Sequence, residues 1–141
     1  MTPRAAALLY MGLTAIVVTF HLAMLLGAPW GHLTMGGRWP GVLPLEWRWL
    51  SVLSALILVG IAYVVAASAG LVTTRPPRWV IHVVLLYMGL AVAVHVATPS
   101  VAERALWLPQ ILVMLACAVR VAFARSHDSA AKTGPRSGRE G

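Results

Sequence analysis

Long apolar stretches separated by short polar segments dominate the pattern along the chain. Four of them cover residues 5–27, 49–72, 79–98 and 101–124. A helix needs about 20 mostly apolar residues to cross a bilayer, and each stretch reaches that length. The first three hold no Asp, Glu, Lys or Arg, each of which would cost roughly 2.5 to 3.5 kcal/mol at bilayer depth. The pattern therefore predicts four membrane-spanning helices.

The fourth stretch is less uniform than the other three. Glu103 and Arg104 lie in its first turn, and Pro109 interrupts it. Ser100 followed three residues later by Glu103 is typical of a capping box, in which the two side chains satisfy free amides at a helix start. We therefore expect Glu103 to cap this helix.

Composition excludes a soluble protein. Of the 141 residues, 60% are hydrophobic and 11% are charged, whereas soluble domains carry roughly 25% charged residues. A soluble fold of this size has too small an interior to bury so much apolar surface. The single cysteine, Cys117, excludes an intramolecular disulfide. We expect an all-α fold, an integral-membrane four-helix bundle of residues 1–125, followed by a disordered basic tail of residues 126–141.

The basic residues that give the net charge of +7 are better explained by topology than by nucleic acid. They flank the apolar stretches and form no basic stripe, so we expect no nucleic-acid partner. Cytoplasmic segments carry the excess of Lys and Arg. With four spans the larger set shares one side: Arg4, Arg75, Arg78, Arg125, Lys132, Arg136 and Arg139. The smaller set, on the other side, is Arg38, Arg48 and Arg104. This predicts a bacterial inner-membrane protein with both termini in the cytoplasm.

The segment between the first two apolar stretches, residues 27–44, is rich in Gly, Pro and Trp. Its sequence, GAPWGHLTMGGRWPGVLP, is too apolar for a solvated loop and too broken for a helix. We expect it to fold back on the outer membrane surface. There it either covers a cavity between the helices or seals the top of the bundle.

Three histidines are predicted at similar depth near the outer side: His21, His32 and His95. Ionisable residues inside a membrane are functional candidates, as acids, bases or ligands. Hydrogen bonding to a neighbouring helix is the structural alternative. A single bis-histidine haem site would need His21 together with His95. We assign no metal or cofactor from these residues.

Two arginines, Arg38 and Arg104, are expected near the outer face. Arginine can bind a phosphate or carboxylate through two parallel hydrogen bonds, as a lipid headgroup would require. Interfacial solvation is the structural alternative. The candidate ligand-binding residues are therefore His21, His32, Arg38, His95 and Arg104.

The loop GAPWGHLTMGGRWPGVLP and the segment SVAERALWLP before the last stretch resemble small uncharacterised bacterial four-span membrane proteins. The resemblance covers most of the chain except the tail. It implies the four-span topology and no particular activity.

Three functional hypotheses remain. The leading one is a non-catalytic binding or accessory component, with a pocket for a lipid or small apolar ligand near the outer face. The second is an integral-membrane enzyme acting on a lipid or isoprenoid through His21 and His95. The third is a metal- or haem-binding redox protein. In each case the bilayer is a partner, and a second copy of the chain or another membrane protein is a further candidate.

Overall fold

A computed structural model describes residues 1–133 of the chain, with side chains described through Ser126. Within that part the fold is built from four long helices: α1 (Pro3–Leu25), α2 (Leu45–Ser68), α3 (Arg78–Ala97) and α4 (Val101–Thr133). Each is long and apolar enough to cross a membrane. The predicted fold class is confirmed: this is an all-helical, multi-pass membrane protein.

A glycine just after the last turn ends α1 and α2, and not the end of the run of apolar residues. Gly27 and Gly70 both have positive φ, at 97° and 72°. After α2, the amide of Leu71 donates to the carbonyl of Ala66, and that of Gly70 donates to Ala67. This is the Schellman arrangement, which favours glycine. The apolar stretch predicted to span 49–72 is therefore a helix that begins at Leu45 and ends at Ser68.

The last helix is longer than the sequence predicts. The fourth apolar stretch was expected to end at residue 124, but α4 continues to Thr133. The predicted disordered tail, 126–141, therefore starts within this helix, and its residues 134–141 lie outside the described part.

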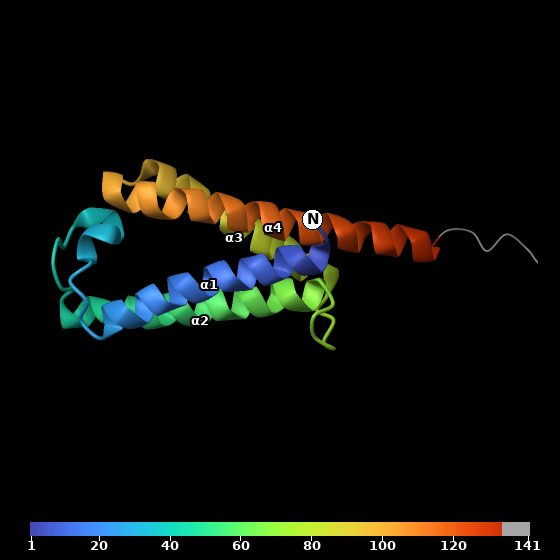
Figure 1. Cartoon of the computed structure of the whole chain (residues 1–141), viewed down its shortest axis with the longest axis horizontal. Helices are drawn as coiled ribbons and strands as arrows, with labels where there is room; N and C mark the ends of the chain where they lie inside the picture. The colour runs from blue at the N-terminus through green and yellow to red at the C-terminus, as the bar shows by residue number, and fades with distance from the viewer. Residues whose placement is uncertain (134–141) are drawn as a thin grey trace, which may run out of the picture.

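The four helices form two antiparallel pairs (Figure 1). α1 packs against α2, α3 packs against α4, and α1 also packs along α4. Contact between α2 and α3 is sparse. The pairs lie close together near the N-terminus and diverge toward the opposite end, where the segment between α1 and α2 crosses from one pair to the other (Figure 1). We call these the narrow end and the loop end.

Small side chains let the helices meet at the narrow end. Ala6, Ala7 and Ala118 are each fully buried there. They pack in one cluster with larger apolar residues such as Tyr10 and Val121. Small residues allow close approach of helix backbones in lipid.

Larger side chains fill the interior at the loop end. Phe20, Met24, Leu43 and Trp107 form a second buried cluster. Phe20 meets the Trp107 ring edge-on at a centroid distance of 4.7 Å. These bulky residues keep the two helix pairs apart at this end.

Candidate functional site

The loop between α1 and α2 folds into two short 3₁₀ turns, η1 (Gly31–Leu33) and η2 (Met35–Gly37). The amide of Gly31 donates to the carbonyl of Gly41 at 2.9 Å, which closes the loop on itself. A Cβ atom added at Gly31 would lie 2.1 Å from the carbonyl oxygen of Trp39. Only glycine fits this close backbone approach. The loop therefore has a defined compact shape.

A buried carboxylate fastens this loop to the bundle. Oε2 of Glu103, in the first turn of α4, accepts hydrogen bonds from the amide of Gly36 at 2.8 Å and the hydroxyl of Thr98 at 3.3 Å. Glu103 is only 7% exposed. Hydrogen bonds to a charged group contribute roughly 1.5 to 3 kcal/mol, about twice as much as neutral ones. Glu103 is therefore the main polar anchor of the loop.

Two neutral hydrogen bonds add to this attachment. The indole N–H of Trp107 donates to the carbonyl of Leu33 at 2.8 Å. The hydroxyl of Ser100 donates to the carbonyl of His32 at 3.0 Å. All three attachments run from the loop to the segment 98–107 around the start of α4.

The capping role expected of Glu103 is only half present. The hydroxyl oxygen of Ser100 accepts from the amide of Glu103 at 3.2 Å, as a helix cap should. The carboxylate, however, holds Gly36 and Thr98. The sequence pattern correctly marked the helix start. It could not show that the carboxylate bonds instead to the amide of Gly36, 67 residues earlier in the chain.

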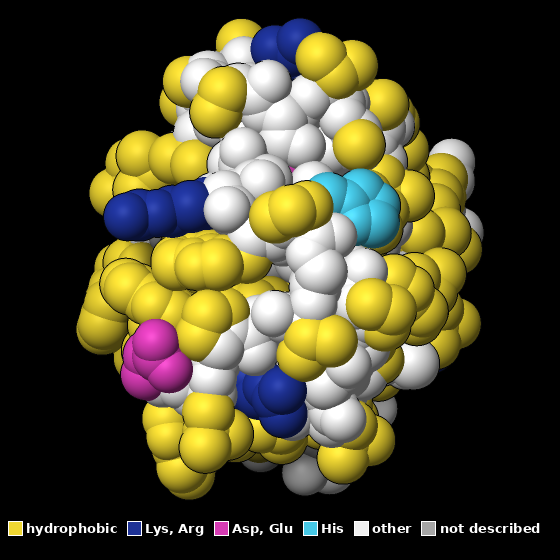
Figure 2. Space-filling model, turned by 90° about the vertical axis from the view of Figure 1, so that its left-hand side faces the viewer, with side chains coloured by type: hydrophobic (Ala, Val, Ile, Leu, Met, Phe, Trp, Pro, Cys, Tyr) yellow, Lys and Arg dark blue, Asp and Glu magenta, His cyan; other side chains and the backbone are white. Residues whose placement is uncertain are grey.

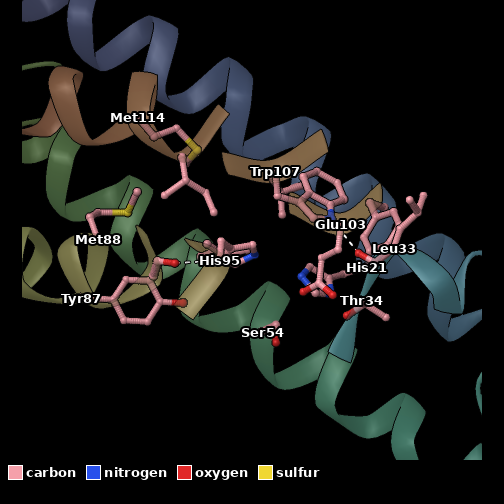
Figure 3. Close-up of a pocket in the computed structure, with 15 residues that line it drawn as sticks. His21, Leu33, Thr34, Ser54, Tyr87, Met88, His95, Glu103, Trp107 and Met114 are labelled. Carbon is pink, nitrogen blue, oxygen red and sulfur yellow. Dashed lines mark hydrogen bonds between the residues drawn. The ribbon is translucent and has the colours of Figure 1, made fainter. Parts of the chain in front are cut away.

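A cavity of about 240 Å³ lies between the two helix pairs, beside the loop (Figure 3). All four helices and the loop contribute to its lining. Its apolar wall includes Val17, Phe20, Leu58, Met88, Ile111 and Met114. Its polar side chains are His21, Thr34, Ser54, Tyr87, His95 and Glu103. Tyr87, which lines the cavity, is also 37% exposed.

The cavity brings together two of the predicted site residues, His21 and His95 (Figure 3). Nδ1 of His21 is buried and, within the described residues, is the one buried side-chain nitrogen or oxygen without a hydrogen-bond partner. His21 also borders an apolar groove between α1 and α2. Nδ1 of His95 lies 2.8 Å from the carbonyl oxygen of Ala91, one turn earlier in α3.

The other three predicted residues lie outside the cavity lining. His32 and Arg38 are exposed on the loop, and the Arg38 guanidinium stacks on Trp39 at 5.1 Å from the ring centroid. Arg104 donates at 3.5 Å to the carbonyl of Val96 and to that of Thr98. At the loop end, basic side chains appear as separated spots and not as a continuous patch (Figure 2). Arg38 therefore contacts an aromatic ring of the loop, and Arg104 contacts backbone carbonyls.

Several residues of the cavity were not singled out from the sequence. Tyr87, Ala91 and His95 follow one another at four-residue intervals, so they share one face of α3. That spacing could have linked Tyr87 to His95. Trp107 also lines the cavity: it is 8% exposed, and its indole is bonded to the loop.

Within the residues that the structure describes, no group of three or more His, Cys, Asp or Glu side chains is placed to hold a metal ion. The comparisons with known proteins add no assignment: no protein-family model, no curated protein and no solved structure matches this chain. The resemblance to small four-span bacterial proteins therefore stays a prediction.

Proposed function

We propose that this protein is a binding component of the bacterial inner membrane that holds one end of a lipid-like molecule in the cavity beside the loop. The observation that carries the proposal is the cavity itself, with apolar walls from all four helices and a small number of polar side chains, among them His21, His95 and Glu103. Ligand pockets typically combine mostly apolar walls with a few placed polar groups. In the orientation predicted from the basic residues, the cavity lies near the outer face.

The size of the cavity supports a partly enclosed ligand. Pockets for whole drug-sized molecules run from about 300 to 1,000 Å³, and this cavity measures about 240 Å³. The cavity is therefore large enough for the polar end of a lipid-like molecule and the first part of its hydrocarbon chain. The remaining chain would leave beside the exposed Tyr87, between α2 and α3, where these helices pack only sparsely.

The partner of His95 supports binding more than catalysis. In a catalytic dyad a carboxylate both orients the imidazole and stabilises its charged form. Nδ1 of His95 instead faces the backbone carbonyl of Ala91. This partner fixes the ring in place without supplying a negative charge, so His95 suits a hydrogen-bonding role.

Filling the cavity tests the proposal. Ala91 lines the cavity, whereas Ala93, on the same helix, is exposed on the outer surface. Additional methylenes forced into an occupied space cost about 1 to 3 kcal/mol, so Ala91→Leu should reduce co-purifying ligand roughly tenfold. Mass spectrometry of molecules extracted from the purified protein measures the reduction.

The matched variant Ala93→Leu should keep the wild-type amount of ligand. Thermal unfolding of both variants in detergent checks that each is folded. Equal ligand content in the wild type and both folded variants would refute the proposed function.

A further inference from the structure

The hydrogen-bonding state of His95 is set by its neighbour. A carbonyl oxygen only accepts hydrogen bonds, so the 2.8 Å contact with Ala91 requires the proton of the neutral ring to lie on Nδ1. Nε2 then carries a lone pair. Because His95 lines the cavity, the ring supplies a hydrogen-bond acceptor for a ligand.

His21 is the second polar group available to a ligand. Its Nδ1 atom is buried and has no hydrogen-bond partner. An unpaired buried polar atom is unfavourable, so His21 gains if its ring turns to bring this nitrogen toward a ligand in the cavity that the side chain lines. A neutral imidazole offers one donor and one acceptor nitrogen. The ring N–H of His21 can therefore donate to a ligand group that accepts hydrogen bonds.

The charges around the cavity disfavour an anionic ligand. Among the described residues, no Lys or Arg belongs to its lining, but the Glu103 carboxylate does. Like charges in a poorly solvated site repel each other strongly. The arginine nearest in sequence, Arg104, donates to carbonyls near the end of α3. A phosphate or carboxylate headgroup would therefore meet repulsion with no compensating cation.

The same carboxylate has little need of a cationic ligand. Oε2 of Glu103 already accepts from the Gly36 amide and the Thr98 hydroxyl. Glu103 also lies in the first turn of α4, where the helix dipole stabilises a negative charge. The negative charge of Glu103 is thus retained but already stabilised, so a cationic headgroup gains little by pairing with it.

Building on the proposed function, we infer that the cavity selects an uncharged, hydroxyl-ended amphiphile, whose hydroxyl donates to Nε2 of His95 and accepts from the ring N–H of His21. A hydroxyl is both donor and acceptor, so it satisfies both imidazoles. This assignment replaces the phosphate or carboxylate headgroup expected from Arg38 and Arg104. Those two arginines take no part in recognition of the polar end.

Competition among three amphiphiles with the same chain tests the inference. The full chain in detergent is loaded with radiolabelled hexadecanol, which is displaced with unlabelled hexadecanol, hexadecyl phosphate or hexadecylamine. We expect hexadecanol to compete roughly tenfold better than either charged compound, the ratio that corresponds to one well-made hydrogen bond.

Two variants link that selectivity to the cavity. His95→Phe should weaken hexadecanol binding roughly five- to tenfold, because it removes the acceptor. His82→Phe is the matched control: His82 contacts the carbonyl of Arg78 in the same way, yet it is exposed and lies outside the cavity lining. Glu103→Gln should narrow the difference between hexadecanol and hexadecyl phosphate, since it removes the repelling charge.

Every other result overturns the inference. Better competition by hexadecyl phosphate would indicate an anion site, and better competition by hexadecylamine would indicate a cation site. Equal competition by all three, unchanged in His95→Phe, would mean that the polar end is not recognised. If the three compounds bind in an Ala91-dependent manner in any of these cases, the proposed function stands and only the ligand class fails. If none binds, both fail.

Discussion

The two ends of the bundle are held together by different interactions. At the narrow end, alanines such as Ala7 and Ala118 are fully buried in an apolar core, and hydrogen bonds from Arg120 and Arg125 are added outside that core. At the loop end, bulky aromatic side chains separate the helix pairs, and hydrogen bonds from Glu103 and Trp107 attach the loop that spans them. Close packing thus joins the helices at one end, whereas directional polar contacts leave space for a cavity at the other.

The substitution with the largest expected effect disrupts only the loop end. Gly31→Ala places a Cβ atom against the carbonyl oxygens of Trp39 and Gly41, which are 2.1 and 2.7 Å away. The backbone must shift, and we expect the loop to lose about 3 kcal/mol of protection, at the upper end of overpacking costs. Hydrogen exchange of the loop amides measures this loss.

Amides of the narrow end should keep their wild-type exchange in Gly31→Ala. Gly41→Ala is the matched control, because a Cβ at Gly41 meets nothing within 4 Å. If Gly31→Ala instead accelerates exchange along all four helices, the loop end and the narrow end unfold together and not independently.

A change of intermediate size tests the narrow end. Ala7 is fully buried between the helices, so Ala7→Leu should lower the free energy of unfolding by about 2 kcal/mol through overpacking. Reversible unfolding in detergent, followed by circular dichroism, measures this quantity. Ala5→Leu, at an exposed position on α1, should leave it unchanged. A bundle that accepts Leu at residue 7 without loss would contradict close packing at this end.

The smallest expected effect isolates one loop attachment. Trp107→Phe keeps an aromatic ring against Phe20 but removes the indole donor to the Leu33 carbonyl. Losing this neutral hydrogen bond should cost about 1 kcal/mol of loop protection. Hydrogen exchange again measures it, with Trp79→Phe as control because Trp79 is 66% exposed. Equal exchange of the loop amides in the two variants would show that Trp107 does not help to attach the loop.

The helices could be predicted from the sequence because their signal is local. About 20 consecutive apolar residues suffice to predict a span, and all four were found. Their ends were less accurate, since backbone geometry decides them: Gly70 ends α2 while the apolar residues Leu71 and Val72 still follow.

The site was only partly predictable because it depends on partners distant in the sequence. His21 and His95 stood out as polar residues within apolar stretches, and both line the cavity. Glu103 was expected to serve only its own helix, because its bond to Gly36 joins residues far apart in the chain. Arg104 was a candidate for headgroup binding, with interfacial solvation as the alternative, and in the structure it donates to backbone carbonyls. The charge of an arginine does not show whether its side chain binds a ligand or a backbone carbonyl.

The loop attachments also determine the order in which the protein can mature during synthesis. The loop emerges from the ribosome early, yet its partners Glu103 and Trp107 follow 67 and 74 residues after Gly36 and Leu33, respectively. Until α4 enters the bilayer, the loop between α1 and α2 lacks these hydrogen-bond partners. The cavity is therefore complete only once α4 has joined the other helices and bonded to the loop.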